Sequence, residues 1–97
     1  MPDKSRVFDI QTYIDTPEAQ SDYLAAAFEE GDPDFIAVAL GDIARARGVT
    51  ALAKETGISR EAIYKSFRAG GNPTLDTLAK AAKALGLRLA LLRTGAG

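Results

Sequence analysis

The chain contains no cysteine and no histidine among its 97 residues, and it has no tryptophan. The lack of cysteine excludes a disulfide framework and favours a cytoplasmic protein. Without either residue type, Cys/His zinc sites, thiol chemistry and imidazole catalysis are also excluded. We therefore expect a binding protein and no enzyme, with no cofactor, no metal ion and no small-molecule substrate.

Long apolar runs are missing as well. No segment approaches the roughly 18 apolar residues that a membrane-spanning helix needs, and residues 1–7 lack the apolar core of a signal peptide. No membrane partner is therefore expected. A chain of 97 residues predicts one domain, 1–97, and so small a domain often gains stability by forming oligomers.

Charge is divided unequally along the chain. Residues 1–48 hold ten acidic and four basic side chains, whereas residues 49–97 hold eight basic and three acidic ones. The halves thus carry net charges of −6 and +5 within a total of −1. This asymmetry indicates two surfaces with different partners, one polyanionic and one basic. The alternative is a solvated acidic helix with chance clustering of the bases.

Capping residues and glycines predict where the helices begin and end. The expected starts lie at Thr16, Asp32, Thr50, Ser59 and Thr74. The expected stops lie at Gly31, Gly48, Gly57 and Gly86, and the fourth helix should run to about residue 69. The last helix should bury Leu75, Leu78, Ala79, Ala82 and Leu85. These signals predict an all-α fold of five helices.

Both ends of the chain are expected to add extended structure. Residues 7–14 alternate poorly and suggest an extended arm or a short strand. Residues 87–93 are too short for a stable helix and suggest a strand. A lone strand must pair with a second copy or with the arm. Leu87, Leu89 and Leu91 would then form a dimer seam; the alternative is a strand folded onto its own helices. The domain would comprise an acidic arm and helix (1–31), a core (32–86) and a C-terminal strand and tail (87–97).

The segment VTALAKETGISREAIYKSFR, residues 49–68, is typical of a helix-turn-helix. Ala53 is small enough for a close helix crossing, and Gly57 suits the left-handed turn four residues later. Four apolar residues would face the core: Leu52, Ile58, Ile63 and Phe67. Thr56 and Ser66 replace the usual apolar residues, and both could be buried through hydroxyl bonds to the backbone.

From Asp34 onward the chain resembles the five-helix repressor-like family of small phage and plasmid DNA-binding proteins. More narrowly, the segments ALGDIARARG, TALAKETGISREAIYKSF and GNPTLDTLAKAAKALGLRL, after the acidic lead-in FDIQTYIDTPEAQSDYLAAAFEEGDPDFI, resemble addiction-module antidote (antitoxin) proteins of the HigA-like, XRE-type helix-turn-helix family. The resemblance covers residues 8–89. It implies an autorepressor that also neutralises a basic toxin of the RelE/ParE-like type.

In such a motif the second helix enters the DNA major groove, so its outward residues are the candidates for base contact. These are Ser59, Arg60, Glu61, Tyr64 and Lys65. Arg60 is the first choice because its guanidinium matches the paired acceptors of guanine. The alternative for Arg60 and Glu61 is a solvated local ion pair. Two modules reading half-sites about one DNA turn apart would require a homodimer.

Other polar residues could contact the phosphate backbone of the DNA. The candidates are Thr50, Lys54, Arg68 and Asn72. Thr50 lies at a helix start, where backbone N–H groups also bind phosphate, although helix capping alone would explain it equally well. Lys54 and Arg68 could equally be merely solvated.

The acidic half is the candidate surface for the basic toxin. The expected toxin-facing residues are Asp15, Glu18, Asp22, Glu29 and Glu30. Complementary charge of this kind steers encounter more than it sets affinity. Four apolar or aromatic residues could either join this contact or belong to the core: Tyr13, Ile14, Tyr23 and Phe28.

Rival functions remain open at the level of sequence. Glu29, Glu30, Asp32 and Asp34 could hold a divalent metal ion, but they lack the spacing of a calcium loop, and helix capping explains them better. A stand-alone repressor without a toxin would use the same helix-turn-helix. A helical protein-interaction adaptor would bind no DNA.

Overall fold

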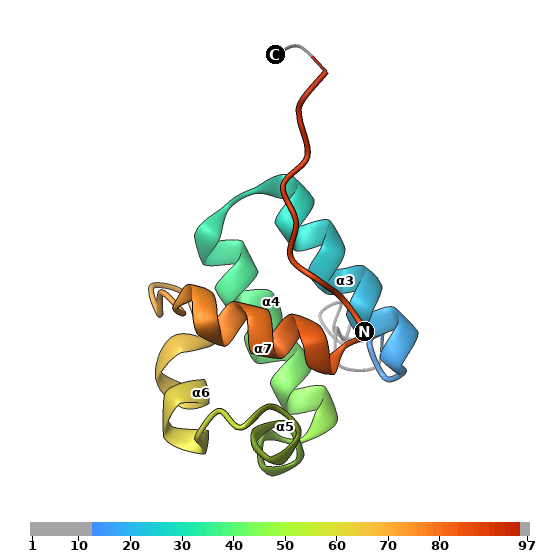
Figure 1. Cartoon of the computed structure of the whole chain (residues 1–97). Coiled ribbons are helices and arrows are strands. Elements are labelled where there is room, and N and C mark those ends of the chain that lie inside the picture. The colour runs from blue at the N-terminus through green and yellow to red at the C-terminus, as the bar shows by residue number, and fades with distance from the viewer. Residues whose placement is uncertain (1–12, 96–97) are drawn as a thin grey trace, which may run out of the picture.

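The computed structural model describes residues 13–95, and its regular structure is helical. The elements are α3 (Pro17–Glu30), α4 (Pro33–Arg47), α5 (Val49–Thr56), α6 (Arg60–Ser66) and α7 (Leu75–Ala84). Figure 1 shows α3 and α4 side by side, with α7 crossing α4 and with α5 and α6 gathered at one end. The expected all-α class is confirmed, and no described helix is long and apolar enough to cross a membrane.

The helix starts and stops follow the predicted signals closely. Side-chain oxygens accept backbone N–H groups at the starts of α3, α4, α6 and α7; the capping residues are Thr16, Asp32, Ser59 and Thr74. Gly31 and Gly57 end α3 and α5 with a φ of 80°, a left-handed conformation that glycine adopts without steric cost.

Two helix boundaries differ from the prediction. α5 begins at Val49 with Gly48 at the capping position, so Thr50 lies inside the first turn and is not the cap. α6 ends at Ser66, not near residue 69. The chain folds back on itself there: a Cβ placed on Gly71 would lie only 2.2 Å from the Ser66 carbonyl oxygen. This sharp reversal leaves no room for another helical turn.

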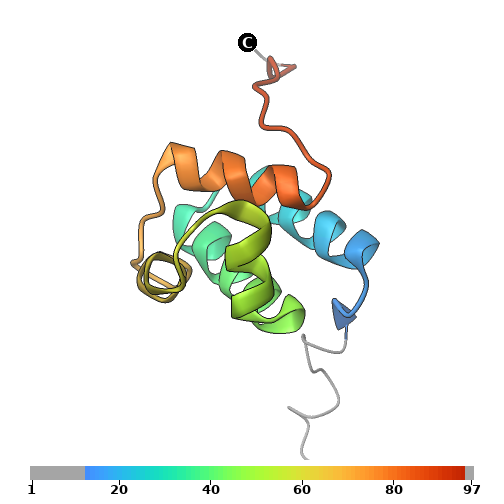
Figure 2. The same cartoon turned by 60° about the horizontal axis from the view of Figure 1, so that its bottom comes forward.

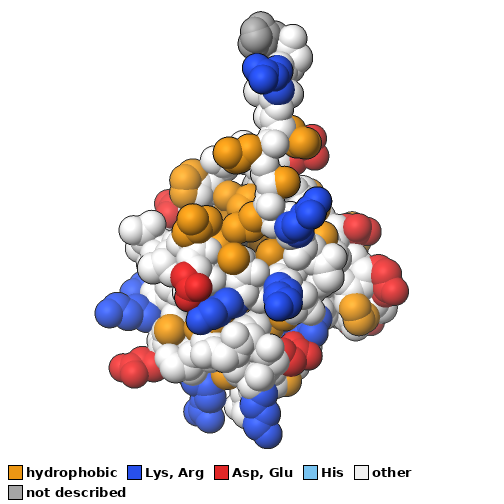
Figure 3. Space-filling model, in the orientation of Figure 1, with side chains coloured by type: hydrophobic (Ala, Val, Ile, Leu, Met, Phe, Trp, Pro, Cys, Tyr) orange, Lys and Arg blue, Asp and Glu red, His pale blue; other side chains and the backbone are white. Residues whose placement is uncertain are grey.

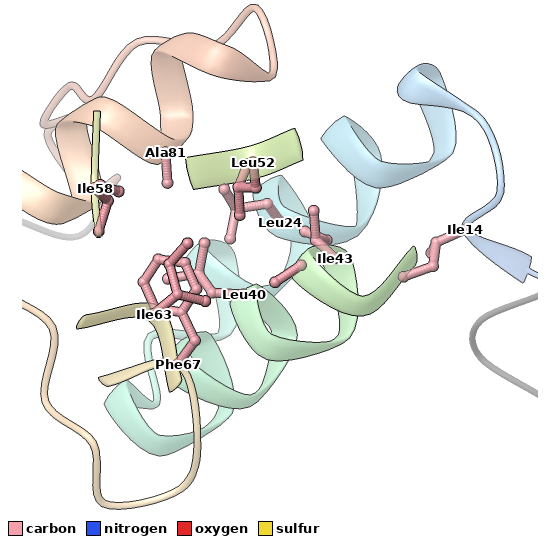
Figure 4. Packing of buried hydrophobic residues seen from close by; sticks show 10 residues of the cluster. Ile14, Leu24, Leu40, Ile43, Leu52, Ile58, Ile63, Phe67 and Ala81 are labelled. Carbon is pink, nitrogen blue, oxygen red and sulfur yellow. The ribbon is translucent and has the colours of Figure 1, made fainter. Parts of the chain in front are cut away.

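The hydrophobic core lies where α4 meets the other helices. Leu40 and Ile43 of α4 point toward Leu52 of α5 and Ile63 of α6 (Figure 4). The other members of this buried cluster are Ile14, Leu24, Ala44, Ile58, Phe67 and Ala81. Every described helix therefore contributes to one core, which fixes the position of α6 relative to α4 and α5.

The core-facing side of α7 agrees in part with the prediction, because Ala82 is buried and Leu78 and Leu85 pack against the core. Leu75 is 72% exposed and Ala79 is also exposed, whereas Ala81 and Ala82 are buried. Leu75 lies in the first turn of α7, whereas the buried Ala81 and Ala82 lie in later turns of this helix, which contacts α5. Figure 2 shows α7 lying across α5 and α4. The prediction for Leu75 and Ala79 was wrong, because both side chains are exposed to solvent.

The C-terminal strand expected over residues 87–93 is absent: among residues 13–95 no strand is present. Leu87 still donates its N–H to Ala82 O at 2.8 Å, but the chain then leaves the body of the molecule (Figure 1). Leu91 is 100% exposed and Leu92 88%. A strand needs a second strand to bind its backbone N–H and C=O groups, and one protomer offers no such neighbour to this segment. The prediction of a strand was therefore wrong for the single protomer. Most of the arm proposed for residues 7–14 lies outside the described residues.

Candidate nucleic-acid interface

The region predicted as a helix-turn-helix contains α5 and α6 joined by residues 57–59. Gly57 donates its N–H to Ala53 O at 2.9 Å and turns the chain. Ser59 then restarts helix formation by accepting the N–H of Ala62 at 3.0 Å. Gly57 thus separates two short helices and does not lie within a continuous one.

The inner side of this helix pair is packed into the core. The side chains of Leu52, Ile58, Ile63 and Phe67 are buried, and Ala53 is half-buried. Because α6 has only seven residues, its orientation depends on these contacts more than on its own helical hydrogen bonds. The outer side of α6 is consequently held in one direction.

Two hydroxyl groups replace apolar contacts at the inner surface, as the sequence suggested. Thr56 Oγ1 donates to Leu52 O at 2.7 Å and accepts the N–H of Ile58 at 3.1 Å. Ser66 Oγ donates to Ala62 O at 2.6 Å. Both hydroxyls are satisfied by backbone groups, so these polar residues can be partly buried without a large desolvation cost.

Sequence reasoning missed the close approach of α4 to the end of α6. Gly41 lies in the buried middle of α4, and a Cβ there would lie 2.3 Å from the Phe67 carbonyl oxygen. Only glycine allows this contact. The sequence did offer one signal for this close approach, a glycine in the middle of a helix and within its apolar stripe. Glycine in a helix interior costs stability, so its presence there indicates that a neighbouring element packs too closely for a side chain.

The residues predicted to contact bases all lie on the exposed side of the helix pair: Ser59, Arg60, Glu61, Tyr64 and Lys65. Tyr64 is 59% exposed although it is aromatic. Within the described part of the chain no ion pair joins Arg60 to Glu61. The guanidinium of Arg60 is therefore not engaged by its acidic neighbour.

The predicted phosphate contacts are exposed as well, namely Thr50, Lys54, Arg68 and Asn72. Arg68 is exposed, and its Nε donates to Lys65 O at 3.1 Å. Asn72 has a φ of 55° in the loop before α7. Figure 3 shows Lys and Arg side chains projecting from the end of the molecule where Figure 1 places α5 and α6.

A hollow of about 190 Å³ lies between α6 and α4, with an apolar floor and with Arg45, Tyr64 and Arg68 at its edge. The sequence did not single out Arg45. Its guanidinium donates to Asp42, which is buried, and Tyr23 Oη donates to the other oxygen of that carboxylate at 2.7 Å. Burial and this hydrogen bond raise the pKa of Tyr23 well above its ordinary value.

A second polar network ties α3 and α4 to α5. Gln20 is only 4% exposed; its Nε2 donates to Ile14 O at 3.0 Å and its Oε1 accepts from Arg47 at 2.7 Å. Arg47 also forms a bidentate pair with Glu55 of α5, with nitrogen–oxygen distances of 2.9 and 3.0 Å. This network connects the segment before α3 to the helix that precedes α6.

The predicted toxin-facing acids are exposed: Asp15, Glu18, Asp22, Glu29 and Glu30. Glu18, Asp22 and Glu29 are spaced by four and seven residues and so share one face of α3. Of the four apolar or aromatic candidates beside them, Tyr13 is exposed, Ile14 is buried in the core, and Tyr23 and Phe28 are half-buried against it. Ile14 therefore belongs to the core.

Residues 13–95 hold no cluster of three acidic side chains that could bind a metal ion. Asp32 caps α4, and Asp34 Oδ1 accepts the N–H of Gly70 at 2.9 Å. Capping and loop anchoring thus account for both carboxylates at the start of α4.

Comparison with known proteins extends over nearly the whole chain. A family model described as "Probable addiction module antidote protein" matches residues 4–93. An uncharacterized protein of Haemophilus influenzae is 40% identical over 88 residues, which cover 91% of each chain. No solved structure matches. The family match includes both the acidic α3 and the basic region around α5 and α6.

Proposed function

Because the chain belongs to the family of probable addiction module antidote proteins, we propose that it is the antitoxin of a toxin–antitoxin pair. In this proposal α5 and α6 form a helix-turn-helix of the repressor-like type and bind operator DNA. The protein acts by binding and not by catalysis. It represses its own operon and neutralises a basic RelE/ParE-like toxin by direct contact.

One observation carries the DNA-binding part of the proposal. Gly57 turns the chain so that Ile63 and Phe67 are buried while Arg60, Tyr64 and Lys65 remain exposed on the opposite side of α6. An exposed, rigidly held helix with a basic face is what major-groove recognition requires. Lys54 and Arg68 flank this face and supply phosphate contacts.

The operator complex contains two protomers in the proposal. One helix-turn-helix buries too little surface for tight specific binding, and a twofold dimer places two such helices about one DNA turn apart. The acidic face of α3 lies on another part of the molecule from α5 and α6 (Figure 3), so it remains available to a basic partner. The two activities would then use separate surfaces.

The first experiment measures binding of the full chain to duplex DNA from upstream of its own gene, at several salt concentrations. Affinity should fall steeply with salt because phosphate contacts release counterions. Arg60→Ala should weaken operator binding by about 1–3 kcal/mol and relax base preference. Asp22→Ala, on the far helix α3, is the matched control and should change neither. If Arg60→Ala left the operator-binding curve unchanged, Arg60 would not contact the bases of the operator.

The second experiment tests the toxin. The chain is co-expressed with the protein encoded beside its gene, and co-purification with a small basic partner is expected. Replacing both Glu18 and Asp22 with lysine should slow association with that partner most strongly at low salt. Salt-dependent operator binding without any such partner would instead identify a stand-alone repressor. A protein that binds a partner but no DNA would be an adaptor.

A further inference from the structure

The surface carries an apolar groove, and Asn72 is the one residue lining it that also belongs to the proposed DNA and toxin contacts. It lies between the start of α4, the loop before α7 and α7 itself, and has a volume of about 430 Å³. Pro33, Ile36, Pro73 and Leu78 supply its apolar lining. Leu75, one turn before Leu78, extends the apolar surface at 72% exposure. Figure 3 shows hydrophobic side chains gathered on the face above the place where Figure 1 draws α7.

The same chain carries an apolar segment that is exposed over most of its length, with Leu89 half-buried. Residues 88–93, with the sequence RLALLR, leave the body of the molecule after α7 (Figure 1). Leu91 and Leu92 are almost fully exposed. So large an apolar exposure on a short extended segment is typical of a surface that becomes covered in an assembly.

Charge and shape make the segment and the groove complementary. The segment has Arg88 and Arg93 at its two ends and leucines between them. The groove has an apolar lining with Asp34 among its residues, and Asp32 is exposed at the start of the same helix. A segment with basic ends and an apolar centre would thus place leucines on apolar side chains and arginine beside carboxylate.

We propose that residues 88–93 of one protomer dock into the groove of a second copy, which returns its own segment in the same way. The idea rests on the proposed function insofar as that function requires a dimer. Reciprocal exchange between two copies gives two equal contacts and closes as a twofold dimer. The segment starts after the end of α7, whereas the groove lies between the start of α4 and the first half of α7.

Cross-linking tests the exchange directly, since the chain has no cysteine. Two differently tagged samples, Leu91→Cys and Pro33→Cys, are mixed under mild oxidation. A disulfide between the two variants should form quickly. It should form much more slowly in a control mixture of Leu91→Cys with Ala51→Cys, because Ala51 is an exposed residue of α5 outside the groove. The double variant Leu91→Cys/Pro33→Cys should give linked dimers. A monomer closed by an internal disulfide would overturn the proposal.

Sedimentation supplies a second measurement without oxidation. Leu91→Ser/Leu92→Ser should raise the dimer dissociation constant at least tenfold, whereas Ala25→Ser, exposed on α3, should leave it unchanged. Both leucines are exposed, so the variant should fold normally. A dimer unaffected by the double substitution, or a wild-type chain that stays monomeric, would overturn the exchange. If the protein binds its operator as a dimer that does not depend on residues 88–93, the docking of this segment is wrong but the proposed DNA-binding function still holds.

Discussion

Gly41 of α4 lies directly against the backbone carbonyl of Phe67, where a Cβ would stand 2.3 Å from the carbonyl oxygen. Phe67 is buried at the end of α6, so this contact sets how closely α6 packs on α4. A backbone carbonyl cannot rotate aside as a flexible side chain can. The pair thus fixes the orientation of the helix that carries Arg60 and Tyr64.

Gly41→Ala should therefore destabilise the protein even though alanine favours helix. Overpacking a tight contact costs about 1–3 kcal/mol, more than the roughly 1 kcal/mol that alanine gains over glycine in a helix. The measurement is the urea midpoint of unfolding. Gly95→Ala is the control, since a Cβ at Gly95 would meet nothing within 4 Å. A Gly41→Ala variant as stable as the wild type would show that α6 can move away from α4 freely.

Gln20→Ala should break the network that joins Ile14, Arg47 and Glu55. The substitution leaves Ile14 O and one Arg47 nitrogen without a partner in a largely buried place. Such unsatisfied groups cost about 1–3 kcal/mol each where water cannot reach them. Chemical denaturation should show the loss, and Asp22→Ala on the exposed side of α3 should not. Equal stability of the two variants would mean that water replaces the Gln20 amide.

The pH dependence of stability should reveal the Tyr23–Asp42 contact. Burial and the hydrogen bond to Asp42 raise the pKa of Tyr23 in the folded chain above the ordinary value of 10.0. The unfolded chain therefore loses the phenol proton first, and the stabilisation is complete below pH 10 and declines as the pH rises further. Urea midpoints of the wild type and of Tyr23→Phe, measured from pH 8 to pH 11, should converge at the alkaline end. Tyr64→Phe, at an exposed position, is the control. A constant difference across this range would contradict the assignment.

Local signals predicted much of this fold. The helix starts at Thr16, Asp32, Ser59 and Thr74 could be predicted because each depends on a local hydrogen bond. The side-chain oxygen accepts a backbone N–H two or three residues further along the chain, so no tertiary contact is needed. Gly57 is equally local, because its left-handed φ follows from the turn itself. The capping residues and the exposed face of α6 could therefore be predicted from spacing alone.

Long-range contacts could not be predicted in this way. The Gln20–Arg47–Glu55 network joins three helices, and no spacing rule brings these residues together. The strand expected over residues 87–93 failed for a related reason: a strand forms only where a partner offers its own N–H and C=O groups. Leu75 was assigned to the core from periodicity, but it is 72% exposed, because periodicity places a residue on a face of its helix without showing which neighbour covers it.

Lys54→Ala and Arg60→Ala should affect DNA binding in different ways, which tests their separate roles. Both residues are exposed, so neither substitution should move the urea midpoint appreciably. Loss of a phosphate contact at Lys54 should weaken binding to operator and unrelated duplexes alike and reduce the salt slope by about 1. Loss of a base contact at Arg60 should weaken operator binding alone, by about 1–3 kcal/mol, and shrink the ratio of operator to unrelated affinity. The measurement is a salt titration of both variants on both duplexes. If Arg60→Ala lowered the two affinities equally, Arg60 would be a phosphate contact and base recognition would fall to Glu61, Tyr64 or Lys65.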